Sequence, residues 1–235
     1  EMLDQAAARL VEPYARAGYD LEAAAILLCE SDGTEEEVEE EIALMTASLR
    51  ASRASQIRVS GSEAERLRFW AGRKSAFPAA GRAAPAYYCM DGTIPRRHLG
   101  AMLTFIQSLE RRYGLQCPNV FHAGDGNLHP LILFDDGDPD SVRRAEAFGA
   151  DILEACVRLG GTVTGEHGVG VEKLGPMCLQ FGRDEIEAFN GVKRAFDPTG
   201  GLNPGKAIPT PHRCAEHGRM LVKRGALSFP DLPRF

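Results

Sequence analysis

Two histidines seven positions apart have the residue type and spacing to do chemistry. His122 and His129 flank a Gly-Asp-Gly-Asn segment between two apolar runs, a pattern that predicts an antiparallel hairpin. If Gly124–Asn127 forms a four-residue turn, the two histidines face each other and their imidazoles project from one face. Directly opposed Cβ atoms lie about 5 Å apart, close enough for two ring nitrogens to bind one metal ion. The pair therefore predicts a metal site.

A second motif, Gly165-Glu-His-Gly-Val-Gly170, offers a carboxylate and another imidazole. Its glycines allow close backbone approach, so Glu166 is the expected third ligand. Two His and one carboxylate leave positions open for substrate or water, as a catalytic divalent metal requires. His167 is then available as a general base, because the ordinary pKa of about 6.5 suits proton transfer. Asp125 is expected to hydrogen-bond the turn backbone instead of a metal.

The same histidines also have a structural interpretation. A lone His at a strand end is commonly a hydrogen-bonded core or surface residue, and His167 could serve only to position its neighbours. The paired spacing, the turn and the Glu-His dipeptide together favour the metal site. A further candidate metal site, with irregular spacing in a Pro-rich tail, is His212, Cys214 and His217.

The elements that must position these residues follow an α+β order. A capping box is expected at Thr34 with Glu37, and Ser62 with Glu65 is expected to open another capped helix. A Pro- and Gly-bearing stretch, 77–85, is expected to interrupt the regular structure. Helices are predicted over 3–17, 34–51, 62–74, 95–113, 140–159, 172–179 and 184–196. Strands are predicted over 23–29 (buried), 56–59, 86–90, 119–122 and 128–134, and a glycine-dense loop over 160–170.

Composition excludes several classes of protein. A net charge of −6 over 235 residues excludes a dedicated nucleic-acid binder, so no nucleic-acid partner is expected. No apolar run approaches the roughly 20 residues of a bilayer-spanning helix. The six cysteines form no C-x-x-C pair, so neither a zinc ribbon nor an iron-sulfur cluster is predicted. The chain begins at Glu1 without a start Met or a targeting signal, and we expect an upstream segment to be missing.

Five longer motifs resemble a known family. In order along the chain, they are similar to the C-terminal half of flavoproteins with the vanillyl-alcohol-oxidase fold. This family includes the FAD-linked subunit of bacterial glycolate oxidase and the D-lactate and D-2-hydroxyglutarate dehydrogenases. The likeness covers nearly all 235 residues, including 212–216. The motifs are Trp70-Ala-Gly-Arg-Lys-Ser-Ala-Phe77, Tyr88-Cys-Met-Asp-Gly-Thr-Ile-Pro95, His122-Ala-Gly-Asp-Gly-Asn-Leu-His129, Gly165-Glu-His-Gly-Val-Gly170 and Phe196-Asp-Pro-Thr-Gly-Gly-Leu-Asn-Pro-Gly-Lys206.

The resemblance implies a domain organisation. It implies an α+β fold in which a ferredoxin-like antiparallel sheet carries helices on one face, followed by a helical C-terminal segment. Residues 1–205 are then an N-terminally truncated substrate-binding (cap) domain, and 206–235 a basic, Pro-containing tail. The FAD-binding domain is expected to be absent from this chain, which has no G-x-G-x-x-G or other phosphate-binding loop. The fragment alone is expected to be inactive.

Residue by residue, the resemblance implies roles for the motif side chains. The family's metal ligands correspond to His122, His129 and Glu166, with Zn, Mn or Fe as the divalent ion, and its catalytic base corresponds to His167. The substrate carboxylate is expected on Arg73, whose guanidinium can bind a carboxylate bidentately. Asn203 matches a residue that faces the flavin.

The implied function is FAD-dependent oxidation of a small 2-hydroxy acid. In the family, a hydride passes from the 2-hydroxy acid to FAD with the help of a metal and a His base, and the product is the 2-oxo acid. Larger dicarboxylic hydroxy acids are oxidised by relatives with polar residues where this chain has Phe77, Cys89 and Leu131. A smaller, less polar pocket therefore favours glycolate or D-lactate over 2-hydroxyglutarate.

Two alternatives to this function stay open. One is a metal-dependent hydrolase, since a His-His-Glu site also activates water. The other is a non-catalytic assembly module of an oxidase complex. The resemblance also implies other glycolate oxidase subunits, including an iron-sulfur subunit, as partners. The expected location is the cytoplasm, and the alternative is peripheral attachment to the inner membrane.

Overall fold

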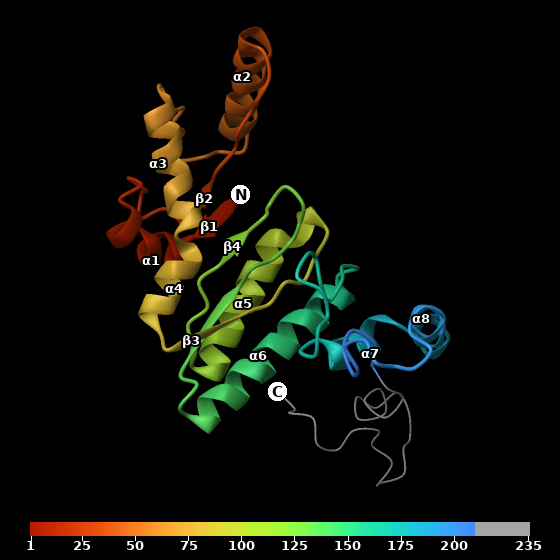
Figure 1. Ribbon diagram of the computed structural model, residues 1–235. Helices are drawn as coiled ribbons and strands as arrows, with labels where there is room; N and C mark the ends of the chain where they lie inside the picture. The colour runs from red at the N-terminus through yellow and green to blue at the C-terminus, as the bar shows by residue number, and fades with distance from the viewer. Residues whose placement is uncertain (210–235) are drawn as a thin grey trace. The chain divides into compact units, whose positions relative to one another are not determined.

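The computed structural model describes residues 1–209, which divide into two compact units (Figure 1). The first unit comprises Glu1–Cys89, Gly114–Asp125 and His129–Ala145. The second comprises Met90–Tyr113, Gly126–Leu128 and the described residues from Glu146 onward. Residues 210–235 lie outside the described residues, and with them the candidate metal site of the tail (His212, Cys214 and His217). The boundary predicted at 205 between the substrate-binding domain and the tail stays a prediction.

All the named strands belong to the first unit and form two small antiparallel sheets. One sheet has the order β2-β1-β4, and the other pairs β3 with β5. The predicted α+β class with antiparallel sheets is confirmed. The strands are β1 (Met2–Asp4), β2 (Ala25–Leu27), β3 (Ala86–Cys89), β4 (Val120–Phe121) and β5 (Leu131–Phe134).

Four helices complete the first unit, and polar caps start three of them. Asp4 accepts a hydrogen bond from the Ala7 N–H at 2.7 Å, and the Thr34–Glu37 capping box is present as predicted. The side chain of Ser62 likewise accepts from the Glu65 N–H at 3.3 Å. The helices are α1 (Gln5–Ala15), α2 (Glu35–Ala51), α3 (Glu63–Lys74) and α4 (Ala76–Ala83).

The core of the first unit joins α1 and α4 to the strands. Its apolar side chains leave water almost completely, which is the main favourable contribution to folding. Figure 1 shows α3 running on into α4, so the end of α3, which carries Arg73, is tied to this core. The buried members are Leu3, Ala7, Val11, Ala76, Ala79, Ala80, Val120, Leu131 and Leu133.

The second unit consists of helices and a long loop in its described part. Tyr113 at the end of α5 stacks on Phe148 of α6 with ring centroids 5.5 Å apart. A small apolar cluster around Val163, Met177 and Ile186 packs the loop against the last helices. Across residues 1–209, no helix has the length and apolar character needed to cross a bilayer. The elements are η1 (Arg96–His98), α5 (Leu99–Tyr113), α6 (Pro139–Arg158, shared with the first unit), α7 (Leu174–Gln180) and α8 (Arg183–Phe196).

Four local predictions were wrong. Residues 2–4 form β1 before the first helix begins, and 56–59 form no strand. The strand predicted as buried over 23–29 is the short edge strand β2, whose Leu27 is 51% exposed. The stretch 77–85 contains most of α4, because Pro78 lies in its first turn, where a missing N–H costs no helical hydrogen bond.

Candidate active site

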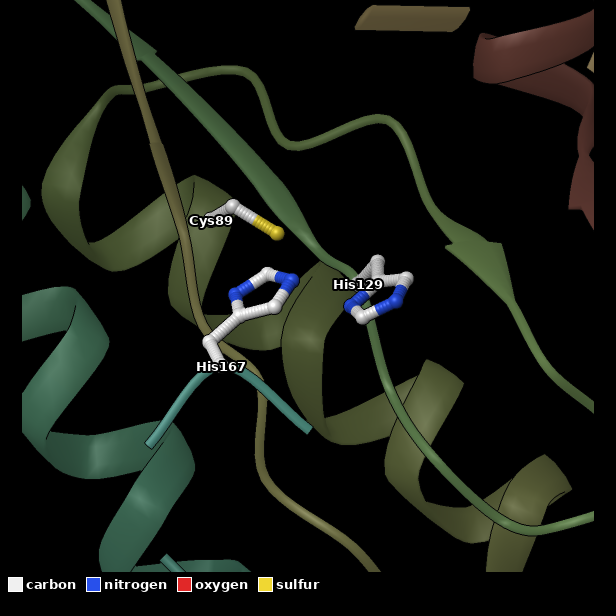
Figure 2. Close-up of side chains that lie close together, drawn as sticks. All are labelled: Cys89, His129 and His167. Carbon is white, nitrogen blue, oxygen red and sulfur yellow. The ribbon is translucent and has the colours of Figure 1, made fainter. Parts of the chain in front are cut away.

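His122 and His129 come together in the first unit. Their ring centroids are 4.8 Å apart, with the rings at 81°. His129 is 2% exposed and lies just before β5, as Figure 2 shows, while the His122 side chain is 28% exposed. The observed proximity matches the expectation from the sequence, and the role of the pair as metal ligands stays a prediction.

The register that brings the rings together differs from the predicted one. The Val120 N–H donates to the His129 carbonyl at 3.2 Å, and Asn119 bridges Pro130. His129 therefore lies opposite Val120, two residues from the predicted partner His122. A slip of two residues keeps every side chain on its face, whereas a slip of one would separate the rings.

Arg73 is joined to His122 through one carboxylate. The Arg73 Nε donates to Glu1 Oε2 at 3.2 Å, and Glu1 Oε1 lies 2.9 Å from His122 Nδ1. The Arg73 and Glu1 side chains are only 10% and 18% exposed, so solvent screens this pair weakly. The two terminal nitrogens of the guanidinium carry four of its five N–H donors. A nearly buried cation thus lies beside an imidazole, with its terminal nitrogens suited to a second carboxylate.

The residues predicted to make the pocket small and apolar also belong to this unit. Phe77 contacts the His129 ring edge-on, with centroids 6.2 Å apart. Cys89, which Figure 2 labels, lies at the end of β3 and pairs with Leu131 of β5, which is fully buried. The three residues predicted to make the pocket small and apolar therefore lie in the same unit as the histidine pair.

Glu166 and His167 lie on the predicted glycine-rich loop, in the second unit. Their side chains are 52% and 42% exposed, with His167 Nε2 3.7 Å from Glu166 Oε1. Their backbone N–H groups both donate to the carboxylate of Asp91, at 3.0 and 2.9 Å. The backbone of the loop is therefore fixed, and it carries a partly exposed carboxylate and a partly exposed imidazole, of which His167 is drawn in Figure 2.

Asn203 lies in the exposed turn after α8, also in the second unit. It has a φ of 44°, in the left-handed region that Asn tolerates better than most residues. Its carbonyl accepts a hydrogen bond from the Lys206 N–H at 3.3 Å. Contact of Asn203 with a flavin stays a prediction.

The donor set of the first unit fits a divalent metal. Imidazole nitrogens suit Zn and Fe, and a carboxylate partner on the second ring nitrogen is the usual companion of a metal-binding His. Glu1 occupies that companion position on His122. The third predicted ligand, Glu166, belongs to the second unit, so its joining the pair is part of the proposal below.

Comparison with known families decides the assignment. The family model described as "FAD linked oxidases, C-terminal domain" matches residues 1–207. The chain belongs to this family. The match includes every predicted site residue, from Arg73 to Asn203.

The curated relatives of this FAD-linked oxidase domain include bacterial proteins. The chain is 56% identical over 235 residues to the glycolate oxidase subunit GlcD of Escherichia coli K12, covering all of this chain and 47% of that protein. It is 36% identical over 206 residues to GlcD of Bacillus subtilis, covering 88% of this chain and 44% of that protein. The chain thus spans less than half the length of these relatives.

A plant relative and two solved structures extend the comparison. The mitochondrial D-lactate dehydrogenase [cytochrome] of Arabidopsis thaliana is 30% identical over 216 residues, covering 91% of this chain and 38% of that protein. The 4-ethylphenol oxidase of Gulosibacter chungangensis matches with a TM-score of 0.61 at 13% identity, over 90% of this chain and 47% of that one. For p-cresol methylhydroxylase the TM-score is 0.50 at 15% identity, over 88% and 46%. These structures show the fold alone, which is that of vanillyl-alcohol-oxidase-type flavoproteins, as predicted.

Three residues of the FAD-linked oxidase domain that organise the site were missed from the sequence. Glu1 links Arg73 to His122, although 72 and 121 residues separate it from them. Asp91 and Lys173 form a buried pair beneath the Glu166–His167 loop. The available signal was weak: Asp91 lies in one of the five resembling motifs, directly after the strand predicted over 86–90, and nothing in its spacing points to the 164–168 loop.

Proposed function

We propose that this chain is the substrate-binding half of a flavin-dependent oxidoreductase that converts glycolate or D-lactate to the 2-oxo acid. This proposal rests on the cluster in the first unit, where the Glu1 carboxylate joins a nearly buried guanidinium to the imidazole of His122, and the His129 ring lies beside that imidazole. A 2-hydroxy acid needs a cation for its carboxylate and a group that stabilises charge at its hydroxyl. The printed names of the relatives, glycolate oxidase and D-lactate dehydrogenase, support this substrate class.

Each side chain has a distinct task in the proposed reaction. The terminal nitrogens of Arg73 bind the substrate carboxylate bidentately. His167 accepts the hydroxyl proton on a ring nitrogen as the hydroxyl becomes a carbonyl. Oxidation of the alcohol releases one proton and one hydride, so a base and a hydride acceptor are both required. The Glu1 carboxylate orients His122 and holds Arg73 at Nε.

Two groups outside the chain's own residues complete the proposal. His122, His129 and Glu166 would hold a divalent ion such as Zn, Mn or Fe, which stabilises negative charge on the substrate hydroxyl oxygen. FAD, which we expect a domain outside this chain to hold for the most part, would supply the hydride acceptor. Asn203, exposed in its turn, is the residue of this chain that we assign to a contact with the flavin.

The residues around His129 set substrate size in this proposal. Phe77, Cys89 and Leu131 carry no charge, so they offer no partner for a second carboxylate. Burying an unpaired carboxylate costs several kcal/mol. The proposal therefore favours glycolate and D-lactate over a dicarboxylic hydroxy acid.

We also propose that the chain works within a complex of several subunits. The bacterial relatives carry the word "subunit" in their names, which supports assembly with other glycolate oxidase subunits. An iron-sulfur subunit is among the proposed partners.

The test uses an enzyme preparation that contains this chain together with bound FAD. Anaerobic mixing with glycolate or D-lactate is expected to bleach the flavin absorption, whereas 2-hydroxyglutarate reduces it much more slowly. Arg73→Lys keeps the charge but loses the guanidinium fork, so the KM for glycolate is expected to rise about 10- to 100-fold. Arg82→Lys, at an arginine that stacks on Tyr14 in the same unit, is the matched control with unchanged KM.

The same preparation separates this function from the hydrolase alternative. Turnover of ester or peptide substrates with zinc and without flavin would favour the hydrolase. Failure of all three hydroxy acids to reduce the flavin would reject the proposed oxidation.

A further inference from the structure

The second unit contains a buried carboxylate on which one loop converges. Asp91 is 0% exposed. Its Oδ2 accepts hydrogen bonds from Thr164 Oγ1 at 2.6 Å and from the backbone N–H groups of Gly165 and His167 at 3.1 and 2.9 Å. Its Oδ1 accepts from the Glu166 N–H at 3.0 Å. Three consecutive backbone N–H groups therefore surround an anion, in the manner of an anion-binding turn whose anion is supplied by the chain itself.

Lys173 balances the charge of this carboxylate. Its Nζ lies 3.0 Å from Asp91 Oδ2, and its side chain is 3% exposed. Burying a lone carboxylate is costly, so the ammonium and the loop N–H groups are what allow Asp91 to stay ionised there. Burial raises the pKa of Asp91, but the hydrogen bonds from the loop and from Lys173 outweigh burial and hold this pKa well below its ordinary value.

The loop itself is shaped for this contact. A Cβ on Gly165 would come within 2.4 Å of Asn127 Oδ1, so the close approach requires glycine. Gly168 has a φ of +85°, and its N–H donates to Thr164 Oγ1 at 2.9 Å. Thr164 thus accepts from the far end of the loop while its hydroxyl donates to Asp91. These hydrogen bonds use the loop backbone, and the side chains of Glu166 and His167 stay about half exposed.

We propose that Asp91 and Lys173 are positioning residues that hold Glu166 and His167 where the oxidation needs them. This inference rests on the proposed function, in which Glu166 is a metal ligand and His167 the base. Both residues act through the loop backbone and do not touch the substrate. A carboxylate is required because all its partners are donors. An amide has the same shape but turns an N–H toward one of them.

The main experiment is Asp91→Asn in the FAD-loaded enzyme. The rate of flavin reduction by glycolate at saturation is expected to fall about 10- to 100-fold, since misplaced supporting groups cost this much. The KM for glycolate is expected to stay within about twofold, because Arg73 holds the substrate carboxylate in the other unit. Hydrogen exchange at the backbone amides of 165–167 is expected to become at least about tenfold faster.

Asp151→Asn is the matched control in the same unit. Asp151 accepts hydrogen bonds from Arg112 Nη1 at 2.9 Å and from the Tyr113 hydroxyl at 2.8 Å, so the change also breaks a carboxylate–cation pair. Neither of these donors belongs to the 164–168 loop. The variant's rate of flavin reduction and its exchange at 165–167 are expected to match those of the wild type.

Milder variants keep the inference testable if Asp91→Asn does not fold. Thr164→Val removes the 2.6 Å hydrogen bond from the hydroxyl and is expected to lower the rate a few-fold with the same pattern of exchange. Lys173→Met removes the neutralising charge and is expected to act like Asp91→Asn. Lys173→Arg restores a cation and is expected to recover part of the rate.

The outcomes separate this inference from the proposed function. An Asp91→Asn enzyme that loses no more rate than Asp151→Asn, or that keeps wild-type exchange at 165–167, overturns the positioning role. A wild-type enzyme that no 2-hydroxy acid reduces rejects the proposed function instead. In that case, exchange at 165–167 in the two variants still decides whether Asp91 holds the loop.

Discussion

Two carboxylates organise the two units of this domain in different ways. In the first unit, Glu1 lies between the side chains of Arg73 and His122 and is 18% exposed. In the second unit, Asp91 is fully buried, and backbone N–H groups from 165–167 donate to it. Glu1 thus contacts individual side chains, whereas Asp91 fixes the path of the backbone that carries Glu166 and His167.

The largest effect is expected from the imidazole that the Asp91-bound loop carries. His167→Ala should lower flavin reduction by glycolate roughly 10²- to 10⁴-fold, the usual contribution of a general base. Bound FAD should keep its absorption spectrum, because the loop backbone and its bonds to Asp91 do not depend on the imidazole. Stopped-flow absorbance measures the rate, with His98→Ala in η1 as the control. Normal reduction in the His167→Ala enzyme would remove this residue from the mechanism.

A smaller effect, on metal affinity, is expected when the Glu1 carboxylate of the first unit is changed. Glu1→Gln keeps the length of the side chain but loses the charge that faces Arg73 and His122. Metal affinity is expected to fall roughly tenfold, at the low end of the range for groups that support a metal-binding His. Zinc titration by calorimetry measures it.

The control for Glu1 is a second glutamate of the first unit. Glu12 accepts backbone hydrogen bonds from Gly18 and Tyr19, at 2.8 and 3.2 Å, so Glu12→Gln makes the same change without touching the cluster. If Glu1→Gln binds zinc as tightly as Glu12→Gln, then Glu1 serves Arg73 alone.

The sequence predicted those parts of the fold that depend on neighbours in the chain. The Thr34–Glu37 capping box and the Ser62 cap are contacts over three residues, and both are present. Strand β1 was missed because its partners, β2 and β4, lie about 25 and 120 residues away and its residues merge into a helical pattern. Local apolar spacing contains no information about such pairing.

The same distinction between local and long-range contacts applies to the candidate site. His122 and His129 were found because a short connection fixes their faces, even though the predicted register was two residues out. The partners of Glu1 and Asp91 are 72 to 121 residues away along the chain, so only the folded structure brings these groups together. Arg73 and Asn203 were identified by resemblance, since nothing in the spacing of either residue points to a ligand.

The smallest effect is expected where a carboxylate supports a turn at the surface. Asp197 accepts a hydrogen bond from Lys193 and from the backbone N–H groups of Gly201 and Leu202. The hydrogen bond from Lys193, followed by those from the turn, lowers the pKa of Asp197. A folded-state pKa below the unfolded value stabilises the protein at neutral pH, and this contribution is lost as the pH falls below about 4.

Asp197→Asn should therefore unfold at a slightly lower urea concentration than the wild type at pH 7. The difference should narrow at pH 3, where the carboxylate of the unfolded wild-type chain is already protonated. Urea unfolding followed by fluorescence at the two pH values measures both midpoints. A difference that is the same at pH 3 and pH 7 would show that Asp197 acts through its shape and not through its charge.

The proposed metal site is tested most directly by the metal content of the purified protein and by its dependence on ligands from both units. We expect about one divalent ion per chain in the wild type, and at least about 100-fold weaker zinc binding in His129→Ala and in Glu166→Gln alike. Full metal content and unchanged affinity in both variants would contradict the proposed site.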